Sequence, residues 1–309
     1  MSDPSAPDGR TRHYGVFYGL GGLDSEEPVA LVHGNCQAES LRQALDGGGL
    51  ATVRMPPVHE LEATDLPHLE AWLARASVLV SQPVRAGYRG LPVGAAQLAS
   101  CLPEAAGVVR VPVIRFAGLY PAQAIVRSPT DPGLDPPVVA YHDLRVLAEA
   151  AARRTGAAVR RATLTPATVR TIAGQSVAEL QRREAAHDTV IASDLFAAPS
   201  FAQMRTINHP GNEVFVALAA RVRARLGLPE HVSALPGPLL DRVHAPREEV
   251  VIAAFGLDAE PVEDWRVDAA PVTVAAVRDA QLAFYARHPE VVDAGLTRHA
   301  ATLALLGLP

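Results

Sequence analysis

The fold is decided by residues 28–37, which read PVALVHGNCQ. The apolar run 29–32 predicts a buried strand, and Gly34 permits a tight turn directly after it. Beyond the turn, Leu41, Ala44 and Leu45 fall on one face of a helix. A strand that turns into an amphipathic helix is the unit from which parallel sheets are built.

The same alternation continues to about residue 120. Strands are expected at 51–55, at 78–80 and at 108–116, where Pro112 indicates an edge or irregular strand. Helices are expected after the cap Asp65, with Pro67 in the first turn, and at 95–102. The pattern predicts an α/β fold, a mostly parallel sheet flanked by helices in a Rossmann-like or SGNH-like arrangement.

We expect three segments along the chain. Residues 1–27, rich in Pro, Asp, Gly and Glu, read as a loose or disordered leader in which 13–20 is a candidate edge strand. Residues 28–228 form the α/β catalytic domain and 229–309 a helical extension packed on it. After the proline-rich loop 121–137 nearly everything is expected to be helical, so the C-terminal half is largely helical. The expected helices are 144–154, 166–185, 213–226, 246–255, 274–287 and 291–306.

Composition excludes several classes of protein. The formal net charge is -5 over 309 residues, without a basic run, which argues against a nucleic-acid partner. The longest apolar runs are far shorter than the ~20 residues of a membrane span. Two cysteines and a polar N-terminus do not suit a secreted disulfide scaffold. We therefore expect a cytoplasmic protein with no membrane span. All 28 basic residues are Arg, a bias typical of GC-rich coding, although Arg also grips phosphate well.

The chemistry is expected at Cys36, the residue that opens the first helix. Unpaired backbone N–H groups and the positive end of the helix dipole favour a thiolate, the reactive form of the side chain. Asn35 and Gln37 supply amide donors beside the sulfur, and Ser81-Gln82 follow the third strand. Since ligands gather at the carboxyl ends of parallel strands, we expect these segments to converge on one crevice. The alternative is that Cys36 is a small buried filler of the core.

The base expected beside this thiolate is His209, which stands between Asn208 and Pro210 in a polar turn that opens a helix. The pairs His142-Asp143 and His187-Asp188 are weaker candidates, because neighbours in sequence seldom face one another on a helix. A metal site built from Cys36, His33 and His209 lacks CxxC or HxxxH spacing, so no metal is expected. Neither a GxGxxG nor a phosphate-loop motif occurs.

Three blocks in order, Gly34–Gln37, Ser81–Val84 with Tyr88, and Asn208–Pro210, make residues 29–226 resemble the WcbI family of polysaccharide-biosynthesis enzymes. The resemblance implies a coenzyme A-binding acetyltransferase that decorates capsular sugars. It supports Cys36 and His209 as the catalytic pair. Residues after about 228 and the loop 121–137 have no match in this pattern, so an acceptor specificity housed there is not implied.

The expected function is transfer of an acyl, acetyl-like group from a thioester to a hydroxyl or amine of a sugar or natural-product acceptor. The donor is coenzyme A or the phosphopantetheine of an acyl carrier protein. Cys36 takes the acyl group or holds the thioester, and His209 accepts the acceptor's proton. The remaining candidates position the substrate or oxyanion, namely Asn35, Gln37, Ser81, Gln82 and Asn208, or bind the coenzyme, namely Arg85, Tyr88, Arg89 and Arg115.

Two other functions remain open from the sequence. A thioester or ester hydrolase would use the same pair with water as the acceptor. A non-catalytic coenzyme A-binding protein would leave Cys36 to pack only, and slow alkylation of its thiol would favour that reading.

Overall fold

A computed structural model describes residues 8–23, 25–131 and 133–309. They form two compact units, between which the chain passes several times. Unit 1 takes its described residues from 1–113, 181–192 and 212–239, and unit 2 from 114–180, 193–211 and 240–309. These units divide the chain elsewhere than at residue 228. The expected division into a catalytic domain 28–228 and a C-terminal extension 229–309 therefore stays a prediction.

Unit 1 is built on a parallel sheet whose strand order is β2-β1-β3-β4. Its strands are β1 (Val29–His33), β2 (Ala51–Val53), β3 (Val78–Ser81) and β4 (Gly107–Arg110). β1 and β3 are buried almost throughout, as expected of central parallel strands that are covered on both faces. The predicted α/β fold with a mostly parallel sheet is confirmed. The predicted strand 108–116 is regular only as far as Arg110, ahead of Pro112.

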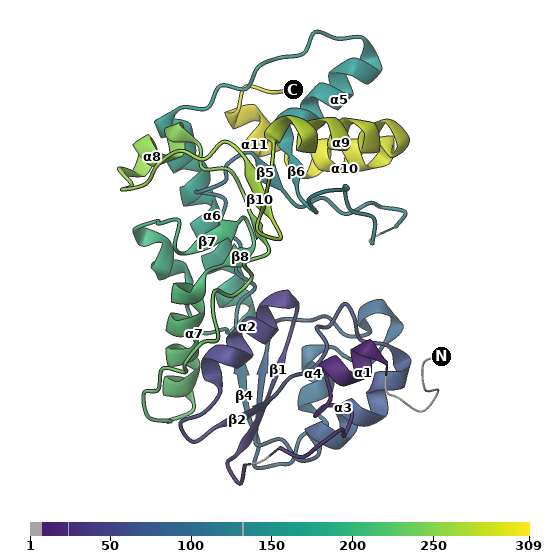
Figure 1. The fold of residues 1–309 in the computed structure, drawn as a ribbon, viewed down its shortest axis with the longest axis vertical. Coiled ribbons are helices and arrows are strands. Elements are labelled where there is room, and N and C mark those ends of the chain that lie inside the picture. Colours follow the sequence, from purple (N-terminus) through teal and green to yellow (C-terminus); the bar gives the residue numbers. More distant parts are fainter. Residues whose placement is uncertain (1–7, 24, 132) are drawn as a thin grey trace. The chain divides into compact units, whose positions relative to one another are not determined.

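Helices lie on both sides of this sheet (Figure 1). α2 and α7 lie on one side, whereas α1, α3 and α4 lie on the other. The bounds are α1 Gly9–His13, α2 Cys36–Leu45, α3 Leu66–Leu73, α4 Ala95–Ala99 and α7 Asn212–Arg225.

Arg223 of α7 links that helix to the C-terminal end of α2 by hydrogen bonds. Its side chain is 1% exposed and donates to the carbonyl oxygens of Pro229 at 2.9 Å, Leu45 at 3.4 Å, Gly47 at 3.0 Å and Gly48. Carbonyl groups at a helix end lack intrahelical partners, so one planar guanidinium can satisfy several of them.

Part of the segment expected to be a loose leader, Asp8 to Leu23, contacts the helices of unit 1. The edge strand expected at 13–20 is wrong: the chain forms α1 and then a run of turns. Phe17 is 1% exposed and packs in the apolar cluster of α3 and β3. Its backbone carbonyl accepts a hydrogen bond from Trp72 Nε1 at 3.0 Å. These contacts attach the segment to unit 1, since a buried aromatic ring stabilises a segment that has little secondary structure of its own.

Unit 2 contains short antiparallel strands that the sequence did not predict. These strands form three small sheets. Two of the sheets have two strands each, β5 (Gln123–Ala124) with β6 (His142–Asp143) and β7 (Met204–Thr206) with β8 (His209–Pro210). The third is a three-stranded sheet of β9 (Val243–His244), β10 (Trp265–Val267) and β11 (Ala270–Val272). Segments of two or three residues are too short to show an apolar period, which is why the region after 142 looked almost wholly helical.

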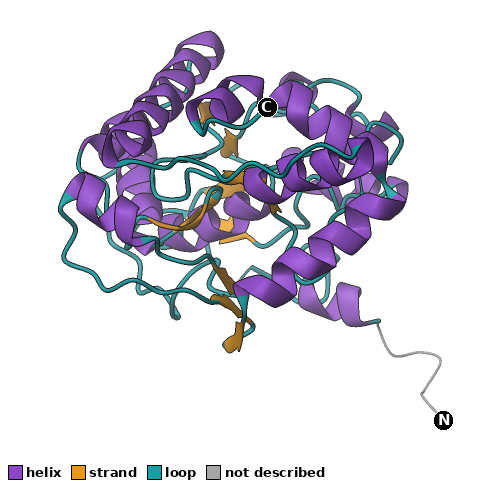
Figure 2. Ribbon diagram, turned by 90° about the horizontal axis from the view of Figure 1, so that it is seen from above, coloured by secondary structure: helices purple, strands orange, loops and turns teal. Residues whose placement is uncertain are grey.

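The helices of unit 2 follow the predicted positions closely. They are α5 Leu144–Thr155, α8 Glu249–Phe255, α9 Val274–Arg287, α10 Pro289–Arg298 and α11 Ala300–Leu305, and α6 Pro166–His187 begins in this unit. The single helix expected over 291–306 is two helices that meet at His299. Figure 2 shows how short the strands are beside the helices. No helix within the described residues is both long and apolar enough to cross a membrane.

Candidate functional site

The predicted site lies where the order of the parallel strands reverses. The chain runs from β1 outward to β2 and then returns to β3 on the other side of β1. His33, the last residue of β1, is in register with Ser81, the last residue of β3. Open α/β sheets bind ligands at such a switch point, outside the carboxyl ends of the strands. The turn Gly34-Asn35 and the segment that follows Ser81 therefore meet at the position where a ligand is expected.

Gly34 is required by the side chain of Gln82. A Cβ atom at Gly34 would stand 2.4 Å from Gln82 Oε1 and 2.7 Å from its Cδ. Because Gln82 comes this close, its Oε1 accepts a hydrogen bond from the backbone N–H of Asn35 at 2.9 Å. The amide of Gln82 thus holds the turn that leads to Cys36.

A second amide contact fixes the start of α2. Asn35 is the N-cap, and its Oδ1 accepts from the backbone N–H of Gln37 at 2.9 Å. Gln82 Nε2 donates to Gln37 Oε1 at 3.2 Å, and both glutamine side chains are buried. Ser81, also buried, donates its hydroxyl to the carbonyl of Gln82 at 2.8 Å. Buried amide networks of this kind hold a turn in one conformation.

Cys36 is the first residue of α2 and is half-buried. The acidic residue of the same first turn, Glu39, would oppose a thiolate if it stood alone. Its carboxylate is instead held by Arg42 at 2.8 Å and by Arg54 at 3.4 Å. α2 itself packs along α7 (Figure 1), so the helix that presents the sulfur is supported on its apolar face.

The residues predicted to bind the coenzyme fall into two groups. Arg85, Tyr88 and Arg89 lie in the loop after β3, in the same unit as Cys36. Arg85 and Arg89 are exposed, whereas Tyr88 packs against the apolar cluster of unit 1. Arg89 donates to the carbonyl of His59, and its backbone has a φ of 51°, a conformation that costs energy for a residue other than glycine. Arg115 belongs to unit 2 and is half-buried.

His209 is held in unit 2 by aromatic and polar neighbours. The ring of Tyr141 meets the imidazole edge-on, at 5.8 Å between centroids. Tyr141 donates its hydroxyl to Asn208 Oδ1 at 2.8 Å and accepts from Thr206 at 2.8 Å, so the turn before His209 is fixed. His209 Nδ1 is buried and has no hydrogen-bond partner among the described residues.

Burial, together with the positive charge of Arg205 and the proximity of His244, lowers the pKa of His209 to about 4. The carboxylate of Asp241 pairs with the basic side chains nearby. It lies 3.1 Å from Arg205, 2.7 Å from His244 and 2.9 Å from Arg266. The imidazole is therefore neutral at pH 7, and a pKa this low makes it a weak base. An anion brought close to the ring would raise its pKa toward the ordinary value of ~6.5.

Sequence reasoning missed Tyr141 and Asp241, and no local motif marks either residue.

Two other histidines are buried and have structural hydrogen-bond partners. His33 Nε2 lies 2.9 Å from the carbonyl of Val93, and His142 Nδ1 lies 2.7 Å from the Tyr285 hydroxyl. Burial lowers the pKa of each to about 4.

The structure therefore brings the predicted residues together in two sets. Unit 1 holds Cys36 with Asn35, Gln37, Ser81 and Gln82, and unit 2 holds His209 with Asn208. The partnership of Cys36 with His209 stays a prediction. In the part of the chain that is described, no group of three or more Cys, His, Asp or Glu side chains is arranged to hold a metal ion.

This chain matches a solved structure and a family model. No curated protein sequence matches it. A solved structure of WcbI, described as "a novel polysaccharide biosynthesis enzyme", superposes with a TM-score of 0.73 at 18% identity, over 91% of this chain and 99% of the other. That structure is of the native protein without a disulfide bond between coenzyme A and one of its cysteines. At this identity the likeness shows the fold.

The family model described as "Polysaccharide biosynthesis enzyme WcbI" matches residues 29–231, about two-thirds of the chain. The matched span begins at the first residue of β1 and includes both the Gly34–Gln37 turn and His209. It agrees with the span 29–226 expected from the three sequence blocks. The chain belongs to the WcbI family of polysaccharide biosynthesis enzymes.

Proposed function

We propose that this protein transfers an acyl group from a coenzyme A thioester to a hydroxyl or amine of a sugar, with Cys36 as the nucleophile. The observation that carries the proposal is the placement of Cys36. It opens a ten-residue helix at the switch point of the sheet, and the Asn35 cap and Gln82 amide fix its turn. A helix N-terminus stabilises a thiolate and can also stabilise the oxyanion of a thioester under attack.

Coenzyme A as the donor is supported by the solved WcbI structure, whose description names coenzyme A together with a cysteine. In this chain the candidates for its phosphates are Arg85 and Arg89, both exposed in the loop beside the Cys36 turn, together with Tyr88 and Arg115. Exposed guanidinium groups suit phosphate because they form forked, charge-assisted hydrogen bonds. A phosphopantetheine on a carrier protein would present the same thioester without the nucleotide phosphates.

The proposed reaction has two steps. The Cys36 thiolate attacks the thioester carbonyl, the bond to the coenzyme sulfur breaks, and coenzyme A leaves as a thiolate. The acceptor hydroxyl then attacks the acyl-cysteine and gives its proton to His209, and Cys36 is released as a thiolate. The proton on His209 finally neutralises the coenzyme thiolate, which balances the reaction. Asn35, Gln37 and Asn208 are the proposed positioning groups.

Mass spectrometry of the intact protein after rapid mixing with acetyl-coenzyme A tests this proposal. We expect the wild type and the matched control Cys101→Ser to gain one acetyl group, and Cys36→Ser to gain none. When an acceptor is added, the wild type should lose the acetyl group and His209→Ala should retain it, because its second step lacks a base. Acetylation of Cys36→Ser, or equal labelling of Cys101, would contradict the assignment. Loss of the acetyl group to water without an acceptor would indicate a hydrolase.

A further inference from the structure

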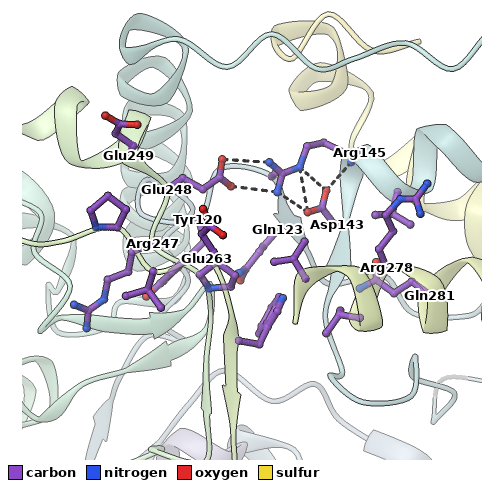
Figure 3. A pocket seen from close by; sticks show the side chains of 18 of the residues that line it. Tyr120, Gln123, Asp143, Arg145, Arg247, Glu248, Glu249, Glu263, Arg278 and Gln281 are labelled. Atoms are coloured by element: carbon purple, nitrogen blue, oxygen red, sulfur yellow. Dashed lines mark hydrogen bonds and ion pairs between the residues drawn. The ribbon is translucent and has the colours of Figure 1, made fainter. Parts of the chain in front are cut away.

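Unit 2 contains a cavity of about 890 Å³ that none of the predicted site residues lines (Figure 3). Its wall is formed by α5, α9, the segment 246–249 at the start of α8 and the strand β10. The volume falls within the ~300–1,000 Å³ typical of sites for small molecules. Every lining residue belongs to unit 2, so the cavity is complete within that unit.

The charges of the wall disfavour a strongly anionic ligand. Five carboxylates line the cavity, those of Asp143, Glu149, Glu248, Glu249 and Glu263. Four guanidinium groups face them, those of Arg145, Arg161, Arg247 and Arg278. The wall thus carries one formal negative charge in excess. A phosphorylated ligand such as coenzyme A would meet net repulsion here.

Two of the four arginines, Arg145 and Arg278, are paired with carboxylates. Arg145 lies between two carboxylates, 2.6 Å from Asp143 and 3.2 Å from Glu248 (Figure 3). Arg278 Nε donates to Glu149 at 3.0 Å. Among residues 8–23, 25–131 and 133–309, Glu249 and Glu263 have no ion-pair partner, and neither do Arg161 and Arg247. The wall therefore offers both donors and acceptors, which suits a ligand rich in hydroxyl groups, because a hydroxyl both donates and accepts.

Gln281 adds an acceptor without a partner. Its side chain is 1% exposed and lies on the wall of the cavity. Nε2 donates to the carbonyl of Tyr141 at 2.8 Å, whereas Oε1 is buried and has no hydrogen-bond partner within the described residues. A buried unsatisfied acceptor destabilises a protein, and a ligand hydroxyl would relieve it after a small rotation about the soft terminal torsion.

The cavity wall is continuous with the turn that carries His209. Trp265 lines the cavity and stacks on Tyr141, with 6.0 Å between ring centroids, and Tyr141 in turn meets His209 edge-on. Gln123 also lines the cavity, and its Oε1 accepts from the backbone N–H of Ile207 at 3.3 Å. A ligand in the cavity would therefore contact residues that position the proposed base.

We propose that this cavity binds a saccharide that is neutral or carries an amine, in preference to phosphorylated and acidic sugars. Saccharides are rich in hydroxyl groups, and polar side chains beside an aromatic ring suit them. The identification of this sugar as the acyl acceptor rests on the proposed function. The binding itself does not, because neither Cys36 nor His209 is needed for it.

The test measures direct binding of glucose, glucosamine, glucuronate and coenzyme A to the full chain by calorimetry. Binding is also followed by the fluorescence of Trp265 in the variant Trp72→Phe, which removes the other of the two tryptophans. We expect glucosamine and glucose to bind and to perturb Trp265, glucosamine more tightly, and glucuronate at least tenfold more weakly. Coenzyme A should not compete. Gln281→Met should weaken glucose binding about tenfold, the loss of roughly one buried hydrogen bond. The matched control Gln175→Met, on the exposed face of α6, should bind as the wild type does.

Glu249→Gln with Glu263→Gln should reduce the preference for glucosamine over glucuronate. The proposal is overturned if no sugar of the panel binds, if coenzyme A displaces the sugar, or if Gln281→Met and Gln175→Met bind alike. Cys36→Ser should bind glucose and glucosamine as the wild type does. Sugar binding without acetylation of Cys36 would sink the proposed function alone. Acetylation without sugar binding would sink the cavity assignment alone.

Discussion

Replacing Gly34 by alanine tests whether the Gln82 amide holds the turn that leads to Cys36. The added methyl group would stand within 3.0 Å of three atoms of that side chain, Oε1, Cδ and Cγ. Gly34 is not among the glycines with positive φ, so alanine fits its backbone and the collision alone is tested. Gln82 must move, and the Asn35 N–H then loses its acceptor at 2.9 Å.

The size of the effect follows from two costs. A buried backbone donor left without an acceptor costs about 1–3 kcal/mol. Overpacking a buried site adds about 1–3 kcal/mol. We therefore expect Gly34→Ala to lower the free energy of unfolding by about 3 kcal/mol and to reduce acetylation of Cys36, because the cap of its helix is displaced.

Urea unfolding measures this change. Gly174→Ala is the matched control, since Gly174 lies exposed inside α6 and a methyl group added there would meet no atom within 4 Å. That change should stabilise the protein by about 0.5–1 kcal/mol. The double variant Gly34→Ala with Gln82→Ala should lose no more stability than Gln82→Ala alone, because the collision is gone. Near-wild-type stability of Gly34→Ala, or additive losses in the double variant, would refute the reasoning.

Further outcomes follow from the same structure. Under limiting iodoacetamide, Cys36 should be alkylated faster than the exposed Cys101, and equal rates would remove the case for a helix-stabilised thiolate. His209→Ala should lower turnover at least ~100-fold and add little to the loss in Cys36→Ser, whereas independent losses would argue against a catalytic pair. Burial lowers the pKa of His33 to about 4, below its ~6.5 in the unfolded chain, so the unfolded state binds more protons between these values. The free energy of unfolding should therefore fall as the pH drops from about 6.5 toward 4, and less steeply in His33→Gln. Arg223→Met should cost about 2–4 kcal/mol in urea unfolding, since backbone carbonyls lose their donor.

The sequence determined the elements whose signals are local. The apolar run of β1, the glycine after it and the cap Asn35 lie within a few residues of Cys36, so the strand, turn and helix around this residue were predictable. The helix expected over 274–287 has these bounds in the structure, with Thr273 as its cap. The predicted convergence of the Gly34 turn with Ser81-Gln82 followed from a general property of parallel sheets.

Tertiary structure decided what depends on residues far apart in the chain. Gln82 reaches Asn35 across 47 positions, and Gln281 reaches Tyr141 across 140. The environment that lowers the pKa of His209 and the wall of the large cavity are likewise built from distant segments. The sequence carries the local periodicity of each segment, but burial and hydrogen bonding arise only when distant segments pack. The sequence by itself thus placed the sulfur on its turn, whereas packing alone decided which amides hold it and where a sugar could bind.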